Sequence, residues 1–329
     1  MRTIGVDLGG SHVLAAIVDE NGTIGERHEI DVVDHDPDAV VRIVADAIAG
    51  ALADAKNKAD IGAVGIGSPG SVDLMTGVVH YSPNFGWHDV ALREMIAGKV
   101  NRQVFVANDA RCATLGEYVH GSGAGTRDFA LLTLGTGIGG GFVSNGAMAL
   151  GHASCAGEIG HHQIRRTDGF FCNCGKVGCF EAQASGTGLI RHALSIAASF
   201  PRSTLVSGKP EKLGSKAIRK AAEAGDPHAL AAWNRYVDDL ACGLANVIAF
   251  INPETIALGG GVASAGAFML DAVRPRVEAL TTMTPRGTTN IVVASLGNDA
   301  GAIGAAAMAR AGGMHAAGQP APAESAVSA

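Results

Sequence analysis

The clearest chemical signal in the sequence is a cysteine-rich segment near its middle. Cys172, Cys174 and Cys179 account for three of the six cysteines, and His161 precedes them. One histidine and three cysteines form a complete tetrahedral ligand set for Zn²⁺, with no position left open for a reactive water. The segment therefore predicts a structural zinc site. The alternative interpretation is a cluster of buried thiols without a metal.

Two glutamates flank this segment. Glu158 lies three residues before His161, and Glu181 lies two residues after Cys179. A zinc site would hold both carboxylates in fixed positions. The alternative for Glu158 is an ordinary exposed glutamate on the protein surface.

Three glycine-rich turns follow predicted strands and could bind phosphate groups. They are Gly9-Gly10-Ser11 after Asp7, Gly135-Thr136-Gly137-Ile138-Gly139 after Leu134, and Gly259-Gly260-Gly261 after Leu258. Glycine lets the backbone approach an anion closely and direct N–H groups toward it. None of the turns has the Gly-Lys-Ser/Thr ending of a P-loop, and the first two lead into strands, unlike a dinucleotide-binding fingerprint. We expect the first two turns to bind nucleotide phosphates and the third to lie beneath the adenosine.

Two aspartates stand at the ends of predicted strands. Asp7 could orient a hydrated Mg²⁺ toward the phosphates, because magnesium is commonly held by one or two carboxylates and by water. The alternative is a buried aspartate that caps the turn. Asn108 and Asp109 end a second apolar strand, where an aspartate often only caps the next helix. Beside a nucleotide, Asp109 could act as the general base that takes a proton from an acceptor hydroxyl.

Recognition of a polyol requires several hydrogen-bond acceptors, because each sugar hydroxyl is a donor. Asn108, Glu158 and Glu181 supply such a set, together with the edge of His161 that would not bind the metal. The sequence thus predicts a sugar site beside the zinc site.

The composition narrows the class of protein. The chain has 329 residues, of which 47% are hydrophobic and 17% charged, and its formal net charge is −6. It is long enough for two domains, and its acidic balance argues against nucleic-acid binding, which requires a basic face. No apolar run reaches membrane-spanning length, and the sequence opens directly on a predicted strand. We therefore expect a cytoplasmic protein with neither a nucleic-acid nor a membrane partner.

Hydrophobic periodicity predicts an α/β protein. We expect strands at 4–7, 13–19, 23–30, 61–67, 103–107, 129–134, 139–144, 255–258 and 291–294, and helices at 39–55, 89–98, 186–198, 215–224, 227–250 and after 264. Each half opens with a strand-turn-strand hairpin, which is typical of two α/β domains with a cleft between them. The expected N-terminal domain covers 1–115 and is completed by a C-terminal helix at 300–311. The expected C-terminal domain covers 116–299, and a disordered tail follows over 312–329.

Together these motifs resemble the ROK family of repressors, open reading frames and sugar kinases. The resemblance runs from Ile4 to about Arg310, and its most specific part is the segment from Cys172 to Glu181. The other matching segments are Asp7 to Ser11, Gly67-Ser68-Pro69-Gly70, Asn108-Asp109, Leu134 to Gly137, and Glu158 to His161. The resemblance implies a two-domain actin/hexokinase-like (ribonuclease H-like) fold and ATP-dependent phosphorylation of a hexose.

The resemblance also implies roles for individual residues. Asp109 matches the catalytic base, and the zinc ligands match His161, Cys172, Cys174 and Cys179. The expected substrate-binding residues are Asn108, Asp109, Glu158, His161, Glu181, Gly70, Asn84 and Gly137. The expected ATP-binding residues are Asp7, Gly9, Gly10, Ser11, His12, Gly135, Thr136, Gly137, Gly139, Gly260 and Gly261.

Two positions depart from the family pattern. The first phosphate turn of the family usually continues Gly-Gly-Thr-Lys, whereas this chain has Ser11 and His12. The serine keeps the hydroxyl, but histidine does not carry a dependable positive charge at pH 7. His162 doubles the histidine at the zinc site, so it could replace His161 as a ligand.

The resemblance implies a glucokinase that uses ATP with Mg²⁺ to phosphorylate the 6-hydroxyl of glucose, as a homo-oligomer that is a dimer or tetramer. One alternative is a kinase for N-acetylmannosamine, N-acetylglucosamine or fructose, because the same residues recur across those activities. The least expected alternative is a sugar-responsive transcriptional regulator. That role requires a helix-turn-helix domain, for which the sequence has no room before Ile4. The sequence does not choose between ATP and polyphosphate as the phosphoryl donor.

Overall fold

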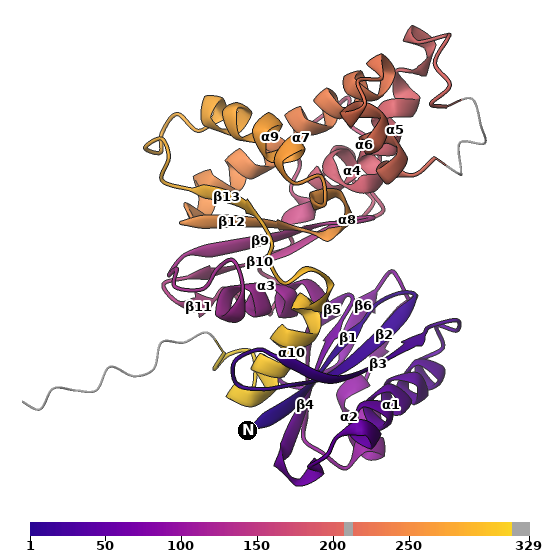
Figure 1. Ribbon diagram of the computed structural model, residues 1–329, viewed down its shortest axis with the longest axis vertical. Coiled ribbons are helices and arrows are strands. Elements are labelled where there is room, and N and C mark those ends of the chain that lie inside the picture. The colour runs from indigo at the N-terminus through magenta and orange to yellow at the C-terminus, as the bar shows by residue number, and fades with distance from the viewer. Residues whose placement is uncertain (207–212, 318–329) are drawn as a thin grey trace, which may run out of the picture. The chain divides into compact units, whose positions relative to one another are not determined.

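The computed structural model describes residues 1–206 and 213–317, which fold into two compact α/β units (Figure 1). The first unit contains Met1–Phe129, Gly141–Gly157 and the described residues from Asn298 onward. The second contains Ala130–Gly140 and the described part of Glu158–Gly297. Most of the predicted tail, from 318 to 329, lies outside the described residues.

The first unit is built on a five-stranded sheet with the strand order β3-β2-β1-β4-β8. The strands are β1 (Arg2–Leu8), β2 (His12–Val18), β3 (Ile24–Asp31), β4 (Ile61–Ser68) and β8 (Val104–Asn108). The first three form an antiparallel meander, whereas β1, β4 and β8 run parallel. Asp7 is in register with Gly67, and Ser68 with Asn108. Because parallel strands end at the same edge of a sheet, Asp7 and Asn108 approach the same edge.

Helices cover this sheet. They are α1 (Pro37–Asp54), α2 (Leu92–Val100), α3 (Asp109–His120) and α10 (Ala300–Ala311). The start of α1 is set by Asp36, whose side chain accepts hydrogen bonds from the backbone amides of Asp38 and Ala39, and by Pro37 in the first turn. Capping by aspartate and proline in the first turn both favour a helix start.

Helix α10, drawn in yellow in Figure 1, packs on the first sheet. A Cβ atom added to Gly5 or Gly65 would overlap the backbone of α10, and one added to Gly304 would overlap the carbonyl of Cys112 on α3. These three glycines therefore permit a backbone approach that no side chain would allow. The approach fixes α3 against the parallel strands that carry the site.

A small sheet in the first unit was not anticipated. It has the order β5-β6-β7, with β5 (Ser71–Val72), β6 (Val79–Ser82) and β7 (Trp87–Val90). The predicted helix at 89–98 is wrong at its start, because Asp89 belongs to β7 and α2 begins only at Leu92. Asp89 has φ 50° and accepts a hydrogen bond from the His80 ring at 2.8 Å. This left-handed backbone is incompatible with the start of a helix.

The second sheet has the strand order β11-β10-β9-β12-β13. Its strands are β9 (Phe129–Leu134), β10 (Ile138–Ser144), β11 (Ala147–Met148), β12 (Thr255–Gly259) and β13 (Asn290–Val293). The helices of the second unit are α4 (Phe180–Ala184), α5 (Gly186–Ser195), α6 (Ser215–Glu223), α7 (Pro227–Ile251), α8 (Gly260–Ala263) and α9 (Ala267–Leu280). Short 3₁₀ turns occur at Lys58–Asp60, Ile159–His161, Ala197–Ser199 and Gly297–Asp299. No helix within the described ranges combines the length and apolar character that a bilayer-crossing segment needs.

Helix α7 forms the centre of the second unit. Asp226 caps its first turn, Pro227 opens it, and Asn252 ends it in the left-handed conformation. Trp233 and Tyr236 are among its buried residues, and so is one carboxylate, that of Asp239. A buried carboxylate on this apolar helix requires a partner.

Candidate active site

An acidic pair lies at the carboxyl edge of the first sheet. Asp7 is the next-to-last residue of β1, and Asp109 is the first residue of α3, directly after β8. Burial and, as the smaller cause, the nearby charge of Asp109 together raise the pKa of Asp7 from 3.8 to about 7. A Cβ on Gly301 would lie 2.6 Å from the Asp7 carboxyl carbon, so the first turn of α10 packs directly on this group. Two carboxylates held together in this way favour a cation beside them.

Asn108, rather than Asp109, caps α3. Its Oδ1 accepts a hydrogen bond from the Arg111 amide at 3.2 Å, and its Nδ2 donates to the carbonyl of Gly70 at 3.1 Å. The interpretation of Asp109 as only a cap is therefore wrong, because its neighbour has that task. Asp109 Oδ1 accepts a hydrogen bond from the Ala110 amide at 2.8 Å. That bond fixes the orientation of the carboxylate at the helix start.

The first glycine turn joins β1 to β2 beside Asp7. Its backbone is closed by a hydrogen bond from the Gly9 amide to the His12 carbonyl at 2.9 Å. A Cβ on Gly10 would meet no atom within 4 Å, so there is room above this turn for a ligand. Ser11 Oγ lies 3.2 Å from Nδ1 of His12, and both side chains are exposed. The turn thus presents backbone and hydroxyl groups to solvent, as a phosphate site requires.

His35 supports this turn, a role that the sequence did not signal. Its Nε2 lies 3.0 Å from the carbonyl oxygen of Gly10. Its ring contacts Phe85 edge-on at 4.9 Å, and its carbonyl accepts the indole N–H of Trp87 at 2.7 Å. The exposed Asn84 precedes Phe85 in the loop between β6 and β7. His35 therefore links the phosphate turn to the loop that carries Asn84.

In the second unit, the four predicted zinc ligands lie together. The Nδ1 of His161 and the sulfurs of Cys172, Cys174 and Cys179 are all within 4.8 Å of one another. Cys174 Sγ is 3.6 Å from Cys179 Sγ, and Cys172 Sγ is 3.8 Å from His161 Nδ1. Zn–S bonds of about 2.3 Å in a tetrahedron place ligand atoms about 3.8 Å apart. The donor set and its spacing therefore fit Zn²⁺.

Burial favours the neutral thiol form of two cysteines in this cluster. Burial raises the pKa of Cys172 to about 12 and also raises the pKa of Cys179. A nearby divalent cation reverses this preference, because it stabilises the thiolate form.

His162 does not join the cluster. Its Nδ1 lies 2.6 Å from the carbonyl of Ile159, and its ring packs on Phe180 at 5.2 Å. Burial lowers the pKa of His162. The arrangement therefore assigns the metal-facing nitrogen to His161, whose Nε2 lies on the other edge of its ring. Glu158 stands just before this turn, and its side chain is exposed.

Glu181 connects the zinc cluster to the second glycine turn. Its Oε2 accepts a hydrogen bond from the Ile138 amide at 3.0 Å, and its Oε1 accepts one from the Cys172 thiol at 3.6 Å. A Cβ on Gly137 would overlap the Glu181 carboxylate. The absence of a side chain at Gly137 therefore allows the Glu181 carboxylate to approach the turn. Gly139 lies just beyond it, in β10.

The other glycines of the second unit divide into supporting and open positions. Gly260 has φ 82° and packs on the end of β9, so it supports the third turn. Cβ atoms on Gly135 and Gly261 would meet nothing within 4 Å, so these positions leave room for a ligand. The carbonyl of Thr136 accepts a hydrogen bond from the Thr187 hydroxyl at 2.8 Å.

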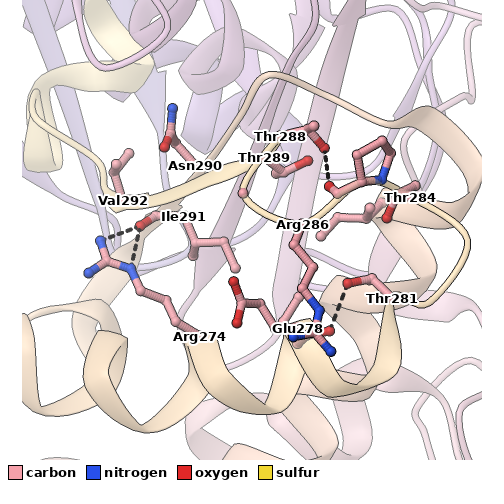
Figure 2. A pocket seen from close by; sticks show the side chains of 14 residues that line it. Arg274, Glu278, Thr281, Thr284, Arg286, Thr288, Thr289, Asn290, Ile291 and Val292 are labelled. Atoms are coloured by element: carbon pink, nitrogen blue, oxygen red, sulfur yellow. Dashed lines mark hydrogen bonds between the residues drawn. The ribbon is translucent and has the colours of Figure 1, made fainter.

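Figure 2 shows a cavity elsewhere in the second unit, between α9 and the segment before β13. It has a volume of about 270 Å³, and residues such as Arg274, Glu278 and Arg286 line it. Arg274 donates to the Ile291 carbonyl through Nε and Nη2. None of the residues that line this cavity is a predicted site residue.

The chain is similar to known proteins over nearly its whole length. The sequence pattern of the ROK family matches residues 3–311. Glucokinases from Streptomyces coelicolor and Thermotoga maritima are 37% and 38% identical to this chain, each over 94% of it and 97% of the relative. The structure is similar to that of a ROK family glucokinase from Streptomyces griseus in complex with glucose and AMPPNP. That similarity has a TM-score of 0.82 at 34% identity and covers 94% of this chain and 99% of the other.

These likenesses confirm the actin/hexokinase-like α/β fold that the motifs implied. The chain belongs to the ROK family.

Proposed function

We propose that this protein is an ATP-dependent hexose kinase that phosphorylates the 6-hydroxyl of glucose, with Asp109 as the general base. The observation that carries the proposal is the position of Asp109. It is held at the start of α3 by the Asn108 cap and faces the acidic end of β1. Relatives that are named glucokinases and match over nearly the whole chain support the same activity.

The chemistry assigned to Asp109 is a single proton transfer. Its carboxylate would accept the proton of the sugar hydroxyl as that oxygen attacks the γ-phosphate. ATP, bound together with Mg²⁺, would supply the transferred phosphoryl group. Asp7 would orient the hydrated Mg²⁺. Its raised pKa shows that the ionised carboxylate is unfavourable beside Asp109, and a bound cation would offset the charge of both carboxylates.

The nucleotide would lie on the three glycine turns. The open space above Gly10, Gly135 and Gly261 supports this assignment. Ser11 would contribute a hydroxyl, and His12 would replace the usual lysine.

The sugar would be bound by polar side chains that match its hydroxyl groups. Asn108, Glu158 and Glu181 would accept hydrogen bonds from its hydroxyls, and the Nε2–H group of His161 would donate one to a sugar oxygen. Gly70 and Asn84 would border the same site. In this arrangement His161 binds zinc through Nδ1 and uses Nε2 toward the sugar, an outer-shell use common for metal-bound histidines.

The metal itself would be structural. A Zn²⁺ bound by His161, Cys172, Cys174 and Cys179 would have no open coordination position. Its role would be to hold Glu181 and His161 in place.

A coupled assay with the purified protein tests this proposal. The protein should produce ADP from Mg²⁺ and ATP when glucose is present, and NMR of the product should show the phosphate on the C6 oxygen. The same assay with N-acetylmannosamine, N-acetylglucosamine and fructose, and with polyphosphate replacing ATP, distinguishes the alternatives. Absence of turnover with every hexose would overturn the proposal.

A further inference from the structure

The second unit contains a buried ion pair outside the catalytic and metal-binding residues described above. Asp239 on α7 is 4% exposed, its Oδ1 accepts a hydrogen bond from Nε of Arg165 at 2.8 Å, and the same oxygen forms an ion pair with Nη2 at 2.7 Å. Its Oδ2 lies 3.1 Å from Nε2 of His192 on α5, which is also 4% exposed. The pair joins residues 74 positions apart in sequence.

Arg165 is attached to the zinc cluster through its backbone. The amides of Ile164 and Arg165 both donate to the carbonyl of Gly178, at 2.9 and 3.1 Å. A Cβ on Gly178 would overlap the Arg165 carbonyl, and Gly178 has φ 76°. Gly178 directly precedes the ligand Cys179. The backbone of Arg165 is therefore hydrogen bonded to the residue that directly precedes Cys179.

A second contact from the same face of α7 meets the same segment. Gly243 lies four residues after Asp239, so both project from one side of the helix. A Cβ on Gly243 would overlap the ring of Phe180, which stands between Cys179 and Glu181. Helix α7 thus holds the segment from Gly178 to Glu181 by a charged contact and by an apolar one.

A buried ion pair of this kind contributes more to geometry than to stability. Removing the Asp239 carboxylate from water is unfavourable, and its attraction to Arg165 only roughly offsets that cost. Its direction and spacing are nevertheless strict, because both N–H groups of Arg165 must meet one oxygen of Asp239.

We propose that Arg165 and Asp239 are positioning residues for the sugar site. They hold the metal-binding segment so that Glu181 and His161 keep the geometry needed to bind the hexose. This inference rests on the proposed hexose kinase function for its kinetic consequences. Its effect on the metal site is independent of that function.

Two neighbouring aspartates on α7 provide a matched test. Asp239→Asn removes the buried charge and keeps the side-chain shape. Asp238→Asn makes the same change one residue earlier, where the carboxylate pairs with Arg276 at 2.7 Å and is 61% exposed. The pair Asp238–Arg276 joins α7 to α9. None of the hydrogen bonds described here connects this pair to the metal-binding segment. Arg165→Lys is a third variant, which keeps the charge and loses the two-point contact.

Steady-state kinetics and zinc release to a chromogenic chelator are the two readouts. Asp239→Asn and Arg165→Lys should release zinc faster and raise KM for glucose by about tenfold or more. KM for ATP should change by less than about twofold for both variants, because the proposed ATP contacts are on the glycine turns. The control Asp238→Asn should match the parent protein in every measurement.

The outcomes separate the two proposals. If the parent protein phosphorylates no hexose, the proposed function fails, and zinc release alone still decides the role of the ion pair. If the parent is active and Asp239→Asn behaves like Asp238→Asn in both readouts, the positioning role is refuted. If Asp239→Asn does not fold, Arg165→Lys decides by the same criteria, because Arg165 is partly exposed and keeps its charge.

Discussion

Replacing Asp7 with asparagine should stabilise the first unit at neutral pH. Burial and the charge of Asp109 raise the pKa of Asp7 from 3.8 to about 7. Between these two pH values the folded protein holds a proton that the unfolded chain has released. The contribution of protonated Asp7 to the free energy of unfolding is therefore fully present below pH 3.8 and is lost as the pH rises through about 7.

The magnitude follows from the size of the shift. About three pH units at about 1.4 kcal/mol each give about 4 kcal/mol as the full cost of ionising Asp7 in the folded protein. This is an upper value, since Asp7 is only partly buried. About 2.5 kcal/mol of the difference between Asp7→Asn and the parent should develop between pH 5 and pH 8.

Tryptophan fluorescence can isolate the first unit. The chain has two tryptophans, Trp87 in the first unit and Trp233 in the second. Urea unfolding of Trp233→Phe protein, in magnesium-free buffer, therefore reports on the first unit. Asp109→Asn is the control, because it removes one cause of the raised pKa and should reduce the pH dependence. If the gain in free energy of unfolding from Asp7→Asn is the same at pH 5 and pH 8, or absent at both, the reasoning is refuted.

Three further predictions concern the metal, the sugar and the packing. Cys174→Ala should bind less than one equivalent of zinc by elemental analysis and melt at a lower temperature than the parent protein. It should also bind glucose poorly while still binding nucleotide, and full glucose affinity would contradict the proposed link between the metal and sugar sites. Glu181→Gln should raise KM for glucose more than KM for ATP, and a change in KM for ATP alone would remove Glu181 from the sugar site. Gly304→Ala should cost about 1–3 kcal/mol or more in urea unfolding, because its Cβ overlaps the Cys112 carbonyl. Gly98→Ala, with nothing within 4 Å, should be neutral or slightly stabilising, and equal losses for both variants would contradict this packing argument.

Much of the fold could be predicted because the relevant signals are local. The apolar runs before Asp7 and Asn108 indicated strands, and the spacing of the cysteines indicated a metal cluster from ligand chemistry alone. The small sheet β5-β6-β7 was missed because its strands have two to four residues each and Asp89 adopts a left-handed conformation.

Other features of the site depend on contacts between distant residues. The support of the Gly10 turn by His35 and the pairing of Arg165 with Asp239 leave no spacing pattern in the sequence. One signal was available for Asp239, since a carboxylate on the apolar side of a long helix requires a buried partner. The partner itself emerges only from the tertiary structure.

The most direct test of the central claim is single-turnover phosphorylation of glucose by the parent protein and by Asp109→Asn, with glucose affinity measured by calorimetry on both. Asparagine keeps the size and hydrogen bonding of the side chain but cannot accept the proton. We expect the rate of phosphoryl transfer to fall by about 10²–10⁴-fold, with glucose affinity nearly unchanged. A rate within a few-fold of the parent protein would contradict the assignment of Asp109 as the general base.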